Sequence, residues 1–446
     1  MGLLAVLIIA GGTLAYVVQP TVHAGTTGES PELGRSGAFE IGTVETRYLL
    51  RNRSRITGWG AVTGSLATGD HELAVRFWYP SDAVSARTPT RYTHELTAGG
   101  QQPILVTSEG FAVEQAAALP GRQFPLVLLS HGYGGWNTQF SNLAEHIASH
   151  GYVVASIEHR DTPADGITAT LLSFANVLVD RTLDQRQILA QIIAGAKAKK
   201  TPYLAQIDPA NIGLIGYSMG GYGAIATAGA AYEFKSQLMS KLPDASQTQL
   251  RTAAETPAPI KALVTFAPWG GQPDNRAWNS QTLANIRVPV MLISGNQDDV
   301  VNFKSGVTWL YDNMIGTERY MLVFREARHN IVGNDFVLGK NERSAAYEFL
   351  KEPVWRSDRL NAINQHFVTA FLDLTLKGDL AKRAYLAVPI VDSNAGDWPI
   401  SFGEQLNGTT AGSEQVNYWR GFQRRWAVGL EMHRKVPAST ASTGRK

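Results

Sequence analysis

The pentapeptide GYSMG at residues 216–220 has the G-x-S-x-G pattern of a serine nucleophile. In this pattern the serine occupies a sharp turn between a strand and a helix, where larger neighbours would clash with the backbone. An apolar run at 212–215 precedes the motif, and a helix-compatible run of small residues follows it at 221–229. We therefore predict that Ser218 is a nucleophile. Because 43 of the 446 residues are glycine, the alternative is a glycine-rich turn in an unrelated α/β fold.

A serine nucleophile needs a general base, and in this class of site the base follows the nucleophile in the chain. Three histidines follow Ser218. His329 comes just after a predicted strand at 320–324, in a loop expected at the edge of a sheet. His366 lies within a helical pattern, and His433 lies in the C-terminal tail. We predict that His329 takes the proton from Ser218 and returns it to the leaving alcohol.

The acid that orients the histidine is expected between the nucleophile and the base. Asp298 and Asp299 directly follow a predicted strand at 288–294. Either carboxylate could stabilise the protonated imidazole, and the spacing from Gly295 favours Asp298. The alternative is a pair of solvated loop carboxylates.

Acyl transfer also needs N–H donors for the developing oxyanion. The residue after the nucleophile, Met219, supplies one backbone N–H. The glycine-rich loop SHGYGG at 130–135 follows a predicted strand, and we expect Tyr133 to supply the second. His131 in this loop is interpreted as structural, since the base should follow the nucleophile.

Substrate contacts are predicted at Tyr133 and at Trp269, which follows a predicted strand at 260–266. Core packing is an equal alternative for Trp269. The helical spacing of His146 and His150 could suit zinc, but no third ligand suggests itself. The sequence therefore predicts neither a metal nor another cofactor.

These residues need a scaffold that brings the ends of several strands together. Short apolar runs alternate with helical stretches, which is typical of a parallel sheet with crossover helices. The predicted strands lie at 124–129, 152–157, 211–217, 260–266, 288–294 and 320–324, with a clear β-like piece at 73–80. The predicted helices lie at 137–150, 171–198, 303–314 and 361–376.

Three motifs, SHGYG at 130–134, ASIEHRD at 155–161 and GYSMGG at 216–221, resemble the isoform II-like branch of the platelet-activating factor acetylhydrolases. This branch of the α/β-hydrolases overlaps with proteins described as dienelactone hydrolases and with bacterial cutinase-like polyester hydrolases. The resemblance covers about residues 70–375. Dienelactone hydrolases use a cysteine nucleophile, which this chain lacks, so that label would describe fold alone.

The resemblance implies an α/β-hydrolase fold with a triad of Ser218, Asp298 and His329. It also implies an oxyanion hole at Tyr133 and Met219. The implied activity is the hydrolysis of short or oxidised acyl esters without a metal.

The chain divides by composition into five parts. The first 24 residues contain an uncharged apolar run that is typical of a signal peptide, and the alternative is a retained membrane anchor. We predict that the protein is secreted or periplasmic, with membrane contact through this segment if it is retained. The predicted parts are a leader at 1–24, a linker at 25–40, a catalytic domain at 41–376 with a lid insertion around 231–259, an extension packed on the domain at 377–435 and a disordered tail at 436–446.

Composition excludes several classes of function. The chain has no cysteine, so disulfides, thiolate metal sites and a cysteine nucleophile are excluded. Its net charge is +2 and it has no long basic run, so we expect no nucleic-acid partner.

We predict a serine carboxylic-ester hydrolase that acts through an acyl-enzyme on short-chain or small acyl esters. The alternatives are a phospholipase A2-like acetylhydrolase on membrane lipids, a polyester hydrolase and a non-catalytic binding module; the oligomeric state stays open.

Overall fold

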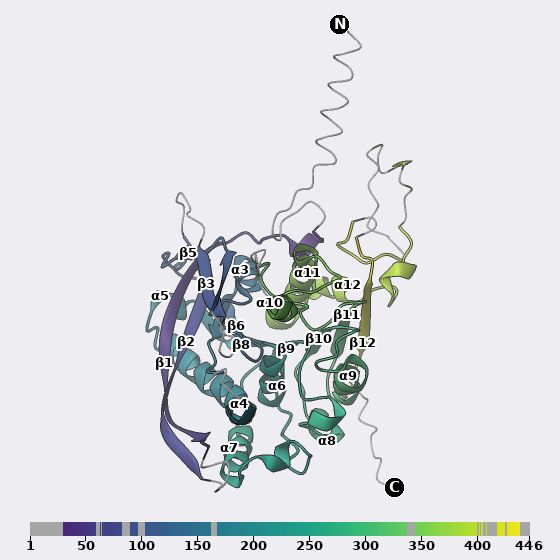
Figure 1. Cartoon of the computed structure of the whole chain (residues 1–446). Helices are drawn as coiled ribbons and strands as arrows, with labels where there is room; N and C mark the ends of the chain where they lie inside the picture. Colours follow the sequence, from purple (N-terminus) through teal and green to yellow (C-terminus); the bar gives the residue numbers. More distant parts are fainter. Residues whose placement is uncertain are drawn as a thin grey trace, which may run out of the picture.

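A computed structural model describes residues 30–58, 63, 65–82, 90–96, 103–161, 167–336, 344–398, 401, 403–404, 407, 417–423 and 426–437. Its centre is a ten-stranded sheet (Figure 1). The strands are β1 (Glu40–Ile56), β2 (Leu66–Ser81), β5 (Val113–Glu114), β6 (Phe124–Ser130), β7 (Val153–Ile157), β8 (Ile207–Tyr217), β9 (Ala262–Phe266), β10 (Val290–Gly295), β11 (Arg319–Phe324) and β12 (Leu430–Lys435).

The strand order is β12-β11-β10-β9-β8-β6-β7-β2-β1-β5. The six strands from β11 to β7 pair in parallel, whereas β2 and β12 join the two ends of this parallel block in antiparallel pairing. Every residue of β7, β9, β10 and β11 is buried, as expected for parallel strands covered on both faces. A separate two-stranded sheet pairs β3 (Arg91–Leu96) with β4 (Ile104–Glu109).

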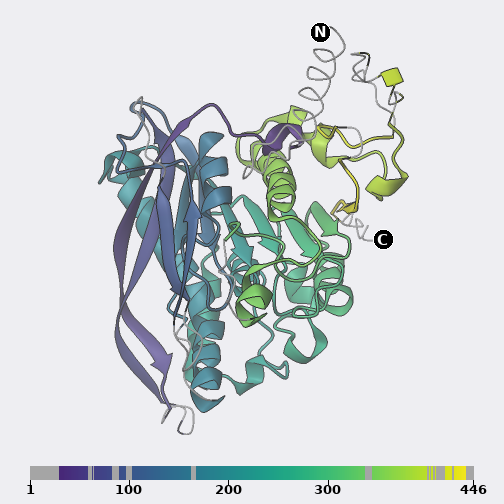
Figure 2. The same ribbon diagram turned by 45° about the horizontal axis from the view of Figure 1, so that its top comes forward.

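Helices cover both faces of the large sheet (Figures 1 and 2). One helical layer contains α4 (Ile167–Lys197), which packs against both α6 (Met219–Thr227) and α7 (Asp244–Glu255), and the other contains α3 (Ser141–Ser149) and α11 (Ser357–Leu376). The other α-helices among the described residues are α5 (Pro202–Ala205), α8 (Ser280–Leu283), α9 (Thr308–Asn313), α10 (Ser344–Leu350) and α12 (Arg383–Leu386). The predicted fold class, a mostly parallel sheet flanked by helices, is confirmed.

The N-terminal strands form a much longer hairpin than the β-like piece predicted around 73–80. β1 and β2 are 17 and 16 residues long, and the end of the hairpin extends beyond the neighbouring strand β7 and lies beside α4 (Figure 2). Asn176 on α4 accepts a hydrogen bond from Ile56 N–H at 2.8 Å and donates one to Ile56 O at 2.9 Å. Arg53 donates to Asp180 and Asp184 at 2.6 and 2.7 Å. The hairpin is thus fastened to α4 at its far end.

The described part of the predicted linker is packed on the domain. Leu33 N–H donates to His366 Nδ1 at 3.1 Å, and Gly37 N–H donates to Ser149 Oγ at 2.8 Å. β1 already begins at Glu40. The predicted leader at 1–24 and all but the first two residues of the predicted tail lie outside the described residues. No helix within the described ranges is both long and apolar enough to cross a membrane.

The segment at 231–259, predicted as a lid, lies beside α4 in the helical layer. Tyr232 Oη is 2.7 Å from Thr182 Oγ1, and Arg186 donates to Thr256 O at 2.7 Å. The Tyr232 ring also stacks on Tyr222. These contacts anchor the segment to α4 and α6, and its role as a lid stays a prediction.

The described part of the C-terminal extension at 377–435 packs on the domain and also completes the sheet. Its last strand, β12, pairs with β11 from Arg319↔Lys435 to Phe324↔Leu430. Trp419, which is almost fully buried, donates from Nε1 to Ile390 O at 2.8 Å. The extension is therefore part of the same folded unit.

Candidate active site

Ser218 lies at the turn between β8 and α6, and its backbone is strained. Its φ of 50° and ψ of −113° are uncommon for a residue with a side chain and cost about 1–3 kcal/mol. Three backbone hydrogen bonds hold the turn: Ser218 N–H donates to Phe266 O at 2.9 Å, and Ser218 O accepts from Tyr222 N–H at 3.0 Å and Trp269 N–H at 3.2 Å. The surrounding strands and helix therefore fix the serine in this conformation.

The two outer glycines of the motif are needed for close backbone packing. A Cβ at Gly216 would lie 2.4 Å from Gly220 O. A Cβ at Gly220 would lie 2.1 Å from Ser130 O, which belongs to the end of β6. Both distances are far below van der Waals contact, so the turn can sit against β6 only without these side chains.

The structure brings Ser218, His329 and Asp298 into one chain of hydrogen bonds. His329 Nε2 lies 3.1 Å from Ser218 Oγ, and His329 Nδ1 lies 2.8 Å from Asp298 Oδ2. The histidine follows β11 and the aspartate follows β10, so the ends of three parallel strands supply the three side chains. Ser218 is 7% exposed, and the side chains of His329 and Asp298 are 14% and 0% exposed.

The two neighbouring aspartates have different surroundings. Asp298 Oδ1 accepts hydrogen bonds from the N–H groups of Val300 and Val301 at 3.0 and 3.1 Å, which fixes the carboxylate with Oδ2 towards His329. The Asp299 side chain is 67% exposed and pairs with Arg328 at 2.7 Å. Asp298, the residue that the spacing favoured, is thus the one in contact with the histidine.

The other histidines considered from the sequence lie elsewhere. His366 accepts from Leu33 N–H, and His433 Nε2 lies 3.0 Å from Glu431 Oε2 on β12. His146 Nε2 contacts Thr369 Oγ1 at 3.0 Å. His150 Nε2 lies 2.9 Å from Arg35 O. Among the residues that the structure describes, no cluster of three or more His, Asp or Glu side chains could hold a metal ion.

The predicted oxyanion loop packs directly against the serine turn. A Cβ at Gly132 would lie 3.4 Å from the Ser218 Cβ. Met219 is the first residue of α6, so its N–H belongs to the group that a helix leaves without an intrahelical acceptor. His131 Nδ1 lies 2.7 Å from Gly132 O, and His131 Nε2 accepts from His159 N–H at 3.0 Å.

These two contacts define the state of His131. Burial lowers the pKa of His131 well below its ordinary value, so the ring is neutral. Because Nε2 accepts a hydrogen bond, the single proton sits on Nδ1 and is donated to Gly132 O. His131 therefore holds the loop, in agreement with the structural role expected for it.

A row of aromatic rings extends from the loop to the end of β9. The Tyr133 and Phe174 ring centroids are 5.8 Å apart, and those of Phe174 and Trp269 are 5.3 Å apart. Trp269 is largely buried, so it contributes both to packing and to this row. Phe174 belongs to α4, and sequence reasoning missed it because no motif marks a helix residue that meets the site only through folding.

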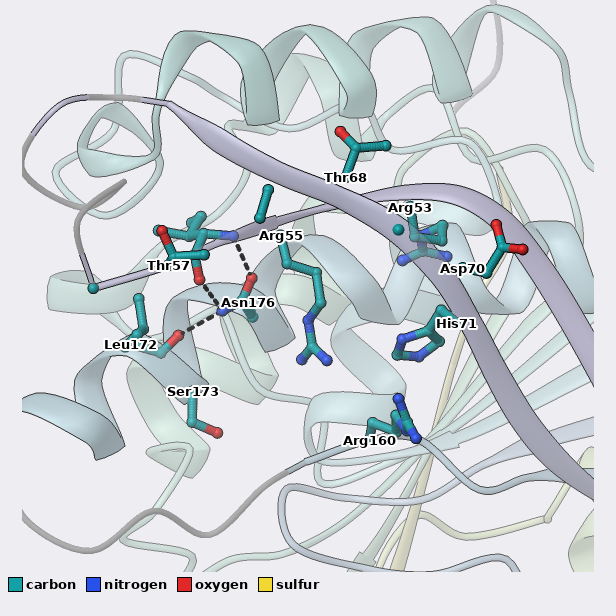
Figure 3. A pocket seen from close by; sticks show the side chains of 14 residues that line it. Arg53, Arg55, Thr57, Thr68, Asp70, His71, Arg160, Leu172, Ser173 and Asn176 are labelled. Carbon is teal, nitrogen blue, oxygen red and sulfur yellow. Dashed lines mark hydrogen bonds between the residues drawn. The ribbon is translucent and has the colours of Figure 1, made fainter.

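A pocket of about 600 Å³ lies between the β1–β2 hairpin and the first turns of α4 (Figure 3). Arg55, His71, Arg160 and Asn176 are among its lining side chains, and neither Ser218 nor His329 is. Asn176 bonds the hairpin from one side of this pocket, as Figure 3 shows. The pocket is therefore distinct from the hydrogen-bonded chain at the strand ends.

Comparisons with known proteins agree with this geometry. Residues 70–176 match the family model described as platelet-activating factor acetylhydrolase, isoform II, and residues 138–354 match that of the prolyl oligopeptidase family. A platelet-activating factor acetylhydrolase of Gallus gallus is 43% identical over 53 residues, which is 12% of this chain and 13% of the relative. Cutinase 2 of Thermobifida cellulosilytica is 26% identical over 179 residues, which is 39% of this chain and 48% of the relative.

Each of these two matches spans less than half of the relative's own length. Together with the fold, these matches support an α/β-hydrolase that is similar to the platelet-activating factor acetylhydrolases and the cutinases, as its motifs predicted.

Proposed function

We propose that this protein is a serine carboxylic-ester hydrolase that acts through an acyl-enzyme on short-chain or small acyl esters. The observation that carries the proposal is the hydrogen-bonded chain from Asp298 through His329 to Ser218, with the serine on a strained turn. A neutral His329 with its proton on Nδ1 donates to Asp298 and presents a free Nε2 lone pair to the serine hydroxyl. This arrangement is the one that proton abstraction from serine requires.

In the proposed mechanism, Ser218 Oγ attacks the ester carbonyl while His329 Nε2 takes the hydroxyl proton. The buried Asp298 carboxylate stabilises the imidazolium that forms. The tetrahedral intermediate then collapses, and His329 gives the proton to the leaving alcohol. A water molecule repeats the same steps on the acyl-enzyme and releases the acid and the free serine.

The negative charge of the intermediate needs donors aimed at the developing oxyanion. We assign this role to the N–H groups of Met219, at the start of α6, and of Tyr133, in the loop that packs on Ser218. The aromatic row of Tyr133, Phe174 and Trp269 would give an apolar acyl or alcohol group a surface to contact.

Two narrower substrate classes follow from the relatives' names. One is the acetyl ester of a platelet-activating-factor-like phospholipid, which a retained N-terminal anchor would favour by holding the site near a membrane. The other is a cutin-like polyester. We also propose that the apolar leader at 1–24 directs export, with membrane anchoring as the alternative.

The first experiment is hydrolysis of p-nitrophenyl acetate, butyrate, octanoate and laurate by the full chain, with Ser218→Ala as the control. We expect kcat/KM to fall with acyl length in the wild type. In Ser218→Ala we expect a loss of at least about 10⁴-fold at every length, because the nucleophile is gone. A serine-directed fluorophosphonate should add one mass label to the peptide containing Ser218 and none to the variant.

A folded wild type that neither hydrolyses any of these esters nor takes the label would contradict the proposal. Cleavage of peptide p-nitroanilides in preference to esters would instead favour a peptidase, in line with the prolyl oligopeptidase match. A phospholipid with an acetyl group and a polyester film then distinguish the two narrower substrate classes.

A further inference from the structure

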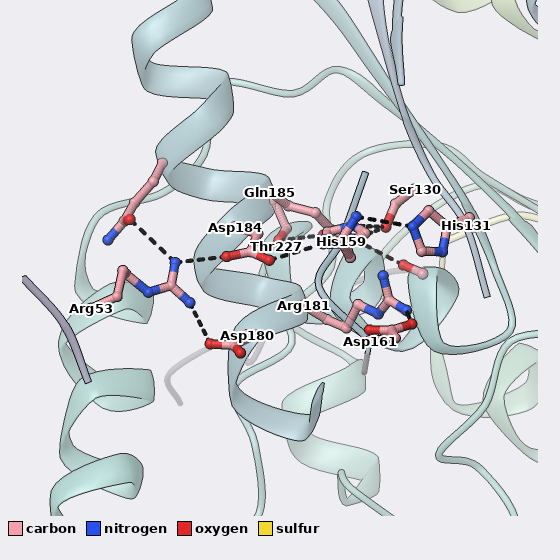
Figure 4. A network of polar contacts seen from close by, with 12 residues as sticks. Arg53, Ser130, His131, His159, Asp161, Asp180, Arg181, Asp184, Gln185 and Thr227 are labelled. Atoms are coloured by element: carbon pink, nitrogen blue, oxygen red, sulfur yellow. Dashed lines mark hydrogen bonds and ion pairs between the residues drawn. The ribbon is translucent and has the colours of Figure 1, made fainter. Parts of the chain in front are cut away.

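A buried ion pair lies directly behind the predicted oxyanion loop. Arg181 comes from α4 and Asp161 follows β7, and their side chains are 1% and 4% exposed. Figure 4 shows the two side chains facing each other beside His131. Both charges are thus removed from water. This desolvation costs free energy unless the charges are paired and their other hydrogen bonds are satisfied.

The hydrogen bonds of this pair go to the backbone of the loop. Arg181 Nη2 donates to Gly132 O at 2.9 Å and also contacts Asp161 Oδ2. Asp161 Oδ2 accepts from Gly134 N–H at 2.9 Å. Within the described chain, Nε and Nη1 of Arg181 are buried without a hydrogen-bond partner. The guanidinium therefore donates its hydrogen bonds to the loop and to the Asp161 carboxylate, which itself binds the loop.

These contacts select one N–H of the loop for the site. Gly134 N–H is occupied by Asp161, so it is not free to bind an oxyanion. The peptide that joins Gly132 to Tyr133 has its carbonyl directed at Arg181. Because a trans peptide is planar, its C=O and N–H point in opposite directions. Tyr133 N–H consequently points away from Arg181, and the loop packs against Ser218 at Gly132.

The charge on Arg181 adds a second effect. A cation that binds the carbonyl end of a peptide polarises that peptide and strengthens its N–H as a donor. The other two donors on this carbonyl, His131 Nδ1–H and Gly135 N–H, are neutral. The charge that adds to the polarisation of this peptide therefore comes from Arg181.

We propose that Arg181, held by Asp161, is a positioning residue that aims and polarises the Tyr133 N–H towards the oxyanion. The inference rests on the proposed ester hydrolysis and deepens it. Such a residue lowers the free energy of the tetrahedral state while leaving the binding of the uncharged ester almost unchanged.

The test compares three variants with the wild-type full chain. Arg181→Met is combined with Asp161→Asn, so that no buried charge is left unpaired and the Asn oxygen can still accept from Gly134 N–H. Arg181→Lys keeps the charge. Arg186→Met is the matched control, because Arg186 is on the same helix and also donates to backbone carbonyls, namely Thr256 O and Thr227 O, but not to the loop.

For each variant the measurements are kcat and KM on p-nitrophenyl butyrate per active site, with sites counted by complete fluorophosphonate labelling. The inhibition constant of an alkyl trifluoromethyl ketone, whose adduct carries an oxyanion, is measured beside it. Removing one oxyanion donor typically costs about 10²–10³ in kcat, so a misaimed donor should cost about 10- to 100-fold.

We expect the double variant to lose about 10- to 100-fold in kcat per labelled site, with KM within about 3-fold of wild type. The ketone should bind more weakly by a similar factor, and Arg181→Lys should recover part of the loss. A lower labelled fraction with wild-type kcat per site would show a merely structural ion pair and overturn the proposal. If the double variant does not fold, Arg181→Lys decides, since wild-type kcat and ketone affinity there would also overturn it. Failure of the wild type to hydrolyse esters or take the label would instead refute the proposed function.

Discussion

The neighbouring residues Asp298 and Asp299 provide a test of the hydrogen-bonded chain in which the same substitution is made one position apart. In Asp298→Asn, the amide must satisfy the same surroundings as the carboxylate. Val300 and Val301 both donate to Oδ1, so the amide oxygen stays on that side. The NH₂ group then faces His329 Nδ1, which lies 2.8 Å from Oδ2 in the wild type. His329 must accept there and carry its proton on Nε2.

A histidine in this tautomer cannot take the proton of Ser218, whose Oγ lies 3.1 Å from Nε2. The expected loss in kcat/KM is about 10³- to 10⁴-fold, or about 4 to 5.5 kcal/mol of barrier. The fold should lose only about 1 kcal/mol, because the two backbone hydrogen bonds to the amide oxygen remain. The assay is hydrolysis of p-nitrophenyl butyrate per labelled active site, with thermal unfolding measured on the same samples.

Asp299→Asn is the control, since Asp299 is largely exposed and its pair with Arg328 is worth at most about 1 kcal/mol. Its kcat/KM should stay within about 2-fold of wild type. Retention of more than a tenth of the activity in Asp298→Asn would refute the tautomer argument. Equal losses in the two variants would refute the assignment of the acid.

Two further predictions concern stability. Burial raises the pKa of Glu158 to about 7 from 4.5, although Asn137 N–H donates to its carboxylate at 2.5 Å. Between these values the unfolded chain has lost a proton that the folded chain keeps, so this group's contribution to the free energy of unfolding falls as pH rises. The stability of Glu158→Gln relative to wild type should therefore increase from pH 5 to pH 8 in urea titrations, and a constant difference would contradict the burial argument. Gly220→Ala should lower the melting temperature by several degrees and kcat by more than about 10-fold, because its Cβ would meet Ser130 O at 2.1 Å. The control is Gly69→Ala, whose Cβ would meet nothing within 4 Å and which should change neither quantity. A Gly220→Ala variant with unchanged melting temperature and kcat would show that the turn can shift.

The sequence predicted the side chains that meet in the hydrogen-bonded chain because each follows a strongly apolar strand. β10 and β11 are buried throughout, and β8 is buried from residue 212 to its end, so the loop residues directly after them could be placed at one sheet edge. Asp298 and Asp299 were harder to separate, because both follow the same strand. The backbone donors that hold Asp298 are formed only by the folded loop.

Other features depend on contacts between distant residues. The second half of β1 carries arginines at 47, 51, 53 and 55 and few apolar residues, so its true length was hidden. β12, with the sequence LEMHRK, is too polar to stand out as a strand and is defined by its pairing with β11. Arg181 lies in a long helix with no motif around it, and only folding brings it to Gly132. The contacts of Tyr232 that anchor the segment at 231–259 to α4 and α6 are likewise formed only by folding.

The pairing of β12 with β11 also has a consequence for the chain's behaviour in solution. All six residues of β11 are buried, and β12 satisfies the outer row of its peptide groups. Without this last strand, an apolar edge with open N–H and C=O groups would be free to recruit a strand from another molecule, which is a common route to aggregation. The C-terminal strand thus protects the sheet edge from pairing with other molecules, and a shortened protein that ends at α11 would lack this protection.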